Sequence, residues 1–90
     1  MKEIILDGDK IDSMEDFHDQ ISILLKFPEF YGRNLDALWD CLTGFIDTNF
    51  KLIWKNHAKS KVVLGDRFEK IIILLDDLKK CEKNFSYELV

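Results

Sequence analysis

Two carboxylates, Asp36 and Asp40, stand four positions apart in the segment NLDALWDCLTGF, with Trp39 between them. At about 100° per residue, a helix through this segment places Asp36, Asp40 and Thr43 on one exposed side, with Trp39 at its border. Like charges at this spacing cost an isolated helix only roughly 0.2–0.5 kcal/mol, and an aspartate in the first turn recovers a comparable amount from the helix dipole. The charges alone favour a plain solvated surface. A partly exposed tryptophan beside them also fits a helix that presents negative charge and an aromatic rim to a cationic pocket of a partner.

Catalytic or metal-binding chemistry has weaker support. Two carboxylates without a histidine or third ligand nearby in sequence are a poor metal site. His18 falls inside a predicted helix, where a structural role is commoner, and His57 stands among lysines and is expected to be solvated. Cys41 and Cys81 have no CxxC or histidine spacing around them, which indicates reduced thiols that serve mainly in packing. We expect no catalytic residue, no metal site and no cofactor, and we predict that the protein is not an enzyme.

The composition predicts one compact domain over residues 1–90. The chain has 90 residues, of which 47% are hydrophobic, with a single proline. The formal net charge of −4 counts against nucleic-acid binding, because such proteins need a basic face, and it favours a cationic partner. No apolar run is long enough for a signal peptide or a membrane span. We therefore expect a cytoplasmic protein without membrane contact, monomeric when free.

A nucleic-acid-binding module is the alternative raised by residues 51–61, KLIWKNHAKSK. Four lysines are interleaved there with Trp54, so phosphate contacts and base stacking could in principle combine. Against this, Trp54 alternates into a presumed buried strand, and four lysines offset an acidic remainder poorly. We consider this function less well supported than protein binding.

The elements that must position the two carboxylates follow from hydrophobic periodicity. Lys2–Leu6 predicts a short strand, buried on both faces and ended by the turn cluster Asp7-Gly8-Asp9. Residues 50–54 predict a second buried strand, and the final FSYELV predicts a closing strand. Strands separated by helical segments predict βαβ crossovers and a parallel sheet.

Four segments are candidates for helices. Ser13 with Asp16 resembles a capping box at the start of a helix from Met14 to about Lys26. After the loop FPEFYG, Asn34 is an N-cap candidate for a helix that has Gly44 near its C-terminal turn. The predicted core face of that second helix is Leu35, Leu38, Leu42, Phe45 and Ile46. Residues 55–61 fit a short helix or a loop, and residues 66–80 predict a long helix.

The stretch FPEFYGRNLDALWDCLTGF resembles the barstar family, intracellular protein inhibitors of secreted ribonucleases such as barnase. The resemblance extends over nearly all 90 residues, although outside this stretch it rests largely on pattern. It implies an α/β fold, a three-stranded parallel sheet packed with three to four helices. It also implies that one helix and the loop before it plug the active site of a basic, extracellular-type ribonuclease in a one-to-one complex.

The resemblance also assigns roles to individual residues. Asp40 would stand in for an RNA phosphate among the cationic groups of the nuclease, and Asp36 would pair with a second cation. The remaining matches to partner-binding positions are Phe30, Asn34, Leu35, Trp39, Thr43, Gly44 and, at the periphery on the long helix, Asp77.

The chain departs from the family pattern at four of these or neighbouring positions. Phe30 replaces a tyrosine, Phe45 a tryptophan and Asp77 a glutamate. Arg33 stands where the family has an acid, which weakens the acidic field toward a basic partner. Two alternatives therefore stay open, a module that binds another cationic protein and an immunity protein for a different nuclease toxin.

Overall fold

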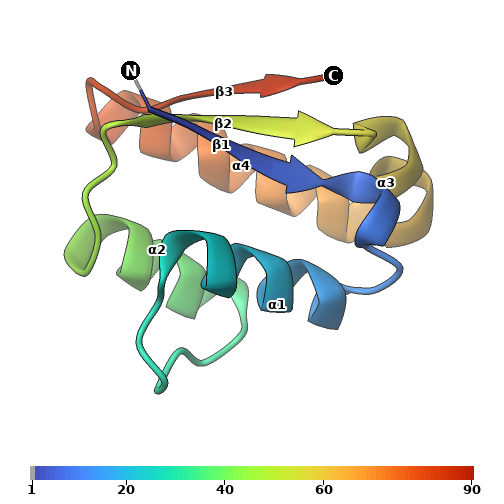
Figure 1. Cartoon of the computed structure of the whole chain (residues 1–90), viewed down its shortest axis with the longest axis horizontal. Coiled ribbons are helices and arrows are strands. Elements are labelled where there is room, and N and C mark those ends of the chain that lie inside the picture. Colours follow the sequence, from blue (N-terminus) through green and yellow to red (C-terminus); the bar gives the residue numbers. More distant parts are fainter. Residues whose placement is uncertain (1) are drawn as a thin grey trace.

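The computed structural model describes residues 2–90, which form a three-stranded parallel sheet in the order β1-β2-β3. The strands are β1 (Lys2–Asp7), β2 (Phe50–Lys55) and β3 (Ser86–Leu89). In the register, Ile4 lies opposite Leu52, which in turn lies opposite Tyr87. All three strands point the same way in Figure 1. The predicted parallel sheet is confirmed.

Within residues 2–90, four α-helices connect the strands, so the predicted number of three to four is met at its upper end. Figure 1 shows α1, α2 and α4 below the sheet and α3 at the end toward which the strands point. Their bounds, with a short 3-10 turn after β1, are η1 (Gly8–Lys10), α1 (Met14–Leu25), α2 (Leu35–Gly44), α3 (His57–Leu64) and α4 (Asp66–Cys81). None of the helices within residues 2–90 combines the length and the apolar character that crossing a membrane requires.

The sheet is covered by helices on one face only (Figure 1). In β1, Ile4 and Leu6 are buried, whereas Ile5 between them is 44% exposed. The prediction that β1 is buried on both faces is therefore wrong. An apolar run such as Ile4-Ile5-Leu6 is typical of strands covered twice, but here the second face has no layer to meet.

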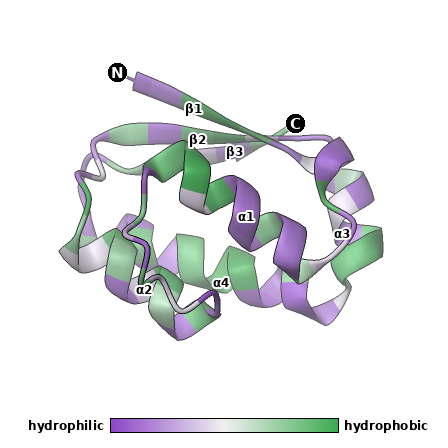
Figure 2. Ribbon diagram, turned by 60° about the horizontal axis from the view of Figure 1, so that its bottom comes forward, coloured by the Kyte–Doolittle hydropathy of each residue, from purple (hydrophilic) through white to green (hydrophobic). Residues whose placement is uncertain are grey.

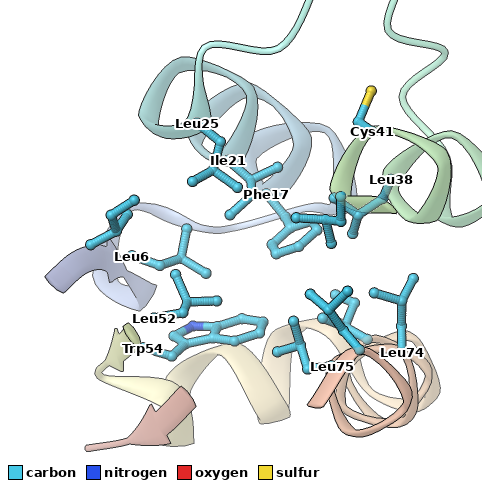
Figure 3. Packing of buried hydrophobic residues seen from close by; sticks show 14 of the residues in the cluster. Leu6, Phe17, Ile21, Leu25, Leu38, Cys41, Leu52, Trp54, Leu74 and Leu75 are labelled. Carbon is cyan, nitrogen blue, oxygen red and sulfur yellow. The ribbon is translucent and has the colours of Figure 1, made fainter. Parts of the chain in front are cut away.

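The core lies between the sheet and the helices, where the apolar faces of the ribbon meet (Figure 2). Trp54 of β2 is 1% exposed and stacks on Phe17 of α1 at a centroid distance of 5.5 Å. Phe68 of α4 packs on the same indole at 5.1 Å. Figure 3 shows Phe17, Trp54 and Leu38 of α2 facing this common interior. The core thus joins α1 and α2, which connect β1 to β2, with α4, which connects β2 to β3.

The start of α1 follows the predicted capping, with one difference. The Ser13 hydroxyl accepts the backbone N–H of Asp16 at 3.1 Å. The Asp16 carboxylate accepts the N–H of Asp12 at 3.0 Å, where a full capping box would bond the N–H of Ser13. At the other end, the chain leaves α1 through Lys26 in the left-handed conformation.

Residues 57–64 form a helix, α3, which settles the choice between helix and loop for this lysine-rich segment. His57 is partly buried, and its Nδ1 lies 3.0 Å from the carbonyl oxygen of Val90. The expectation of a solvated His57 therefore holds only in part, because Val90, which follows the last strand, lies beside the ring. The expectation that both cysteines pack in the interior holds for Cys41, which is buried, and is wrong for Cys81, which is exposed.

Candidate functional site

The loop before α2 is anchored to α1 by one buried hydrogen bond. Nδ1 of His18 lies 2.6 Å from the hydroxyl of Tyr31. The Tyr31 ring also packs on Phe27 at 4.8 Å, and its backbone N–H donates to the carbonyl of Pro28 at 3.0 Å. His18 is therefore a structural residue, as the sequence predicted. This anchor orients the part of the loop that carries Phe30 on its outside.

Asn34 begins α2 through its side chain, as predicted. Its Oδ1 accepts the N–H of Ala37 at 2.8 Å, and its Nδ2 donates to the carbonyl of Gly32 at 3.3 Å. Both ends of the amide are thus engaged within the chain, so Asn34 acts first on the geometry of the helix start. A Cβ on Gly32 would lie 3.2 Å from that of Ala37, so a side chain at this position would require a small shift of its neighbour.

The outer side of α2 carries the side chains that the sequence assigned to a partner. Asp36, Asp40 and Thr43 are exposed, and Trp39 is half-buried. The Thr43 hydroxyl donates to the carbonyl of Trp39 at 2.7 Å, so only its lone pairs remain for a partner. We call these four residues the acidic stripe. Leu38, Cys41 and Leu42, on the opposite side of the helix, are buried and hold the stripe outward.

A shallow groove between α2 and α4 adjoins the acidic stripe. It is lined from α2 by Leu35, Asp36 and Trp39. From α4 it is lined by Lys70, Ile73, Leu74, Asp77, Lys80 and Cys81. Ile73 is 61% exposed and adds apolar surface to this groove. Four of the residues predicted to bind a partner (Leu35, Asp36, Trp39 and Asp77) therefore lie together, although Asp77 is far from the others in sequence. Leu35 is half-buried at this groove rather than central to the core.

Phe30 and Phe45 form an exposed aromatic pair. Phe30 is 71% and Phe45 is 59% exposed, and their rings meet edge to face at 5.5 Å. The assignment of Phe45 to the core face is therefore wrong, because α2 ends at Gly44 and the helical projection does not apply beyond it. Phe45 is a site candidate that the periodicity missed. Its position directly after a helix-ending glycine was the available signal.

Gly44 lies exposed at the last position of α2. A Cβ built at this position would meet no atom within 4 Å. The fold itself therefore does not require glycine here, and the missing side chain leaves the surface between the acidic stripe and Phe45 open to a partner.

Arg33 adopts the left-handed conformation and folds back onto α1. Its guanidinium forms an ion pair with Asp19 and donates to the carbonyl of Glu15. Burial lowers the pKa of His18, and the positive charge of Arg33 lowers it further. Because Asp19 compensates Arg33, this arginine reduces the acidic field of α2 less than its charge alone would predict.

The geometry gives little support to the other functions considered. Trp54 is buried, so the indole on which the nucleic-acid hypothesis relied is not available for base stacking. Within residues 2–90, no three histidine, cysteine or acidic side chains converge as metal ligands. Burial, and to a smaller extent the charge of Asp40, raise the pKa of the Cys41 thiol, which is the opposite of what a nucleophilic cysteine needs.

Comparison with known proteins finds a family and a relative for this chain. The family model described as Barstar (barnase inhibitor) matches residues 1–89. The chain is also 40% identical, over 80 residues, to a Bacillus subtilis (strain 168) protein that bears the name "Putative ribonuclease inhibitor YrdF". That alignment covers 89% of this chain and 88% of the Bacillus protein.

Proposed function

This chain belongs to the barstar family, and from that membership we propose that it inhibits a ribonuclease by inserting the outer face of α2, with the loop before it, into the enzyme's active site. The observation that carries the proposal is the pair Asp36 and Asp40, both exposed one turn apart on a helix whose other side is buried. The function is one of binding, and no side chain of this chain acts as a catalyst.

The chemistry of the target explains why two carboxylates suit this role. An enzyme that cleaves RNA must hold phosphate groups, so its active site is lined with cations. A carboxylate offers two acceptor oxygens to the same arginine, lysine or histidine side chains. In this proposal Asp40 occupies a phosphate position and Asp36 pairs with a second cationic group.

The rigidity of α2 favours tight binding. The Asn34 cap orders its first turn, and Leu38 and Leu42 fix it to the core, so little conformational freedom remains to be lost on association. Trp39 and Leu35 border the carboxylates with apolar surface that excludes water around the charged contacts. Both carboxylates are exposed when the protein is free, which lets them attract a basic enzyme before contact.

The remaining assigned positions surround this centre. Thr43 accepts hydrogen bonds, Gly44 allows close approach, and Asp77 meets the partner at the edge of the α2–α4 groove. Phe30 and Phe45 add an exposed apolar contact at the end of α2. We propose a basic ribonuclease of the barnase type as the partner, in a one-to-one complex formed in the cytoplasm.

The test is a titration of barnase with the purified protein, followed by RNA cleavage at two salt concentrations. The variant Asp36→Ala/Asp40→Ala removes the two central charges. The matched control is Glu3→Ala/Asp9→Ala, which removes two exposed acids from the β1–η1 end of the chain. Circular dichroism establishes that all three proteins are folded.

We expect stoichiometric inhibition by the parent and by the control, and a loss of inhibition in Asp36→Ala/Asp40→Ala. Equal inhibition by all three proteins would refute the role of the acidic stripe. A folded parent that leaves barnase fully active would move the function to another nuclease toxin or another cationic protein, to be captured with the same stripe as bait.

A further inference from the structure

A second surface groove lies next to the proposed docking face and has the opposite charge. It runs between the start of α1, the loop before α2 and the first half of α4. Its lining includes three cationic side chains, Arg33, Arg67 and Lys70, and one carboxylate, Glu15. Met14, His18, Asn34 and Leu35 complete it. We call it the basic groove.

Two of its cations form no ion pair within the part of the chain that the structure describes. Among residues 2–90, Arg33 pairs with Asp19, whereas neither Arg67 nor Lys70 forms an ion pair. Both are exposed and lie three positions apart in the first half of α4, so they share one face of the helix. The positive charge of Arg33 is felt inside the groove, since it lowers the pKa of the buried His18.

The basic groove is continuous with the docking face. Leu35 and Lys70 line both the basic groove and the α2–α4 groove. A protein that covers Asp36 and Trp39 therefore also lies over or beside Arg67 and Lys70. Once a partner excludes water there, an unpaired cation weakens binding and a paired cation strengthens it. Arg67 and Lys70 therefore help to decide which partner binds.

We propose that the basic groove, through Arg67 and Lys70, binds a carboxylate side chain on the rim of the same ribonuclease whose cationic cleft receives α2. This inference rests on the function proposed above and narrows its partner. The enzyme must carry an aspartate or glutamate beside its active site, so this chain selects nucleases with a cationic cleft and an acidic edge.

A protein carboxylate fits this surface better than a nucleic-acid phosphate does. A strand of RNA long enough to cross both grooves would also meet Asp36 and Asp77, which offset the charges of Lys70 and Lys80 in the α2–α4 groove and leave no net attraction for phosphates there. A folded protein can display both signs of charge within a short distance. The Arg67 guanidinium can also hold a carboxylate through two parallel hydrogen bonds.

The experiment compares binding to barnase, and to any other secreted ribonuclease that the parent inhibits. The variants are Arg67→Glu/Lys70→Glu and the milder Arg67→Gln/Lys70→Gln. Lys10→Glu/Lys61→Glu is the matched control, because both lysines are exposed and neither lines the groove. Acids in the first turns of a helix are favourable, so the charge-reversed α4 should fold. A single-stranded RNA oligonucleotide serves as a second probe for all variants.

We expect the Glu variant to bind the nuclease about 10-fold or more weakly, the Gln variant to lie between, and the control to match the parent. Changing one rim acid of the nuclease to lysine should restore part of the loss for the Glu variant. Unchanged or tighter binding by the Glu variant, with the parent still inhibitory, would overturn this inference alone. RNA binding that disappears in the Glu variant would also overturn it in favour of a phosphate site. A parent that inhibits none of the nucleases would overturn the proposed function, and this inference with it.

Discussion

The imidazole of His18 and the hydroxyl of Tyr31 are joined by a buried hydrogen bond, Nδ1 to oxygen at 2.6 Å. His18 lies in the middle of α1, and Tyr31 lies in the loop that presents Phe30 and leads into α2. The bond thus connects a core helix to the proposed docking loop. Both side chains are almost fully buried, at 4% and 8% exposure, so changes in either are transmitted to the site.

The burial of His18 makes stability depend on pH. The pKa of His18 lies below its usual value of 6.5 because of burial and because of Arg33, with Asp19 opposing weakly. The unfolded chain therefore binds a proton on His18 more readily than the folded one. Neutral His18 makes its full contribution to the free energy of unfolding above about pH 6.5. That contribution is lost as the pH falls through this value toward the lower pKa of the folded state.

We expect the free energy of unfolding, measured by urea denaturation, to fall between about pH 7 and about pH 5. The variant His18→Gln should lose that part of the slope, and NMR titration should place the imidazole pKa of the parent below 6.5. An imidazole pKa above 6.5 would contradict the prediction.

Among single changes in the acidic stripe, Asp40→Ala should cost the most affinity for the nuclease. It leaves the cations of the phosphate site buried without a partner, a situation worth about 3 kcal/mol or roughly 100-fold in Kd. Asp36→Ala and Thr43→Ala should cost less. Isothermal titration calorimetry gives the ranking, and an Asp40→Ala variant that binds as tightly as the parent would rule out a phosphate-mimicking role for this residue.

Loss of the α2 cap should weaken both folding and docking. Asn34→Ala removes the acceptor for the Ala37 N–H and should lower the free energy of unfolding by about 1 kcal/mol. Asn34→Ser keeps a capping oxygen and is the control for stability. If Asn34 also touches the nuclease, Asn34→Ser will restore stability without restoring full affinity. Equal stability of Asn34→Ala and the parent would contradict the capping role.

The indole N–H of Trp54 has one partner, the Ser60 hydroxyl at 3.1 Å, and both side chains are fully buried. Ser60→Ala leaves that donor unsatisfied and should cost about 1–3 kcal/mol of stability. Ser22→Ala is the matched control, since the Ser22 hydroxyl bonds the carbonyl of Asp19 at an exposed position of α1. Ser60→Ala should therefore lower the free energy of unfolding more than Ser22→Ala does. Equal losses would mean that a water molecule has replaced the Ser60 hydroxyl as the partner of the indole N–H.

The two thiols should differ in reactivity. Cys81 is exposed at the end of α4 and lines the α2–α4 groove, whereas Cys41 is buried and its pKa is raised. Because the thiolate is the reacting form, a thiol reagent such as DTNB should modify Cys81 quickly and Cys41 only on unfolding. The Cys81→Ser variant should lose the fast phase. In the parent, a bound nuclease that covers the groove should slow the modification of Cys81.

Much of the local structure could be predicted from sequence because it depends on neighbours along the chain. The Ser13 and Asn34 caps, the spacing of apolar residues in α1 and α4, and the alternation around Trp54 each report a helix or strand directly. The motif that runs from the proline loop through α2 was specific enough to place the exposed acidic stripe as well.

What the sequence by itself determined, then, was the kind and order of the three strands and of α1, α2 and α4, the family, and which side of α2 faces outward. The tertiary structure alone decided the rest. The open face of the sheet, the exposure of Phe45, the tether of His57 to the last strand and the junction of Arg67 and Lys70 with Leu35 all depend on which element packs beside which. Periodicity tells which face of an element is apolar, but contacts between distant segments arise only when the layers assemble.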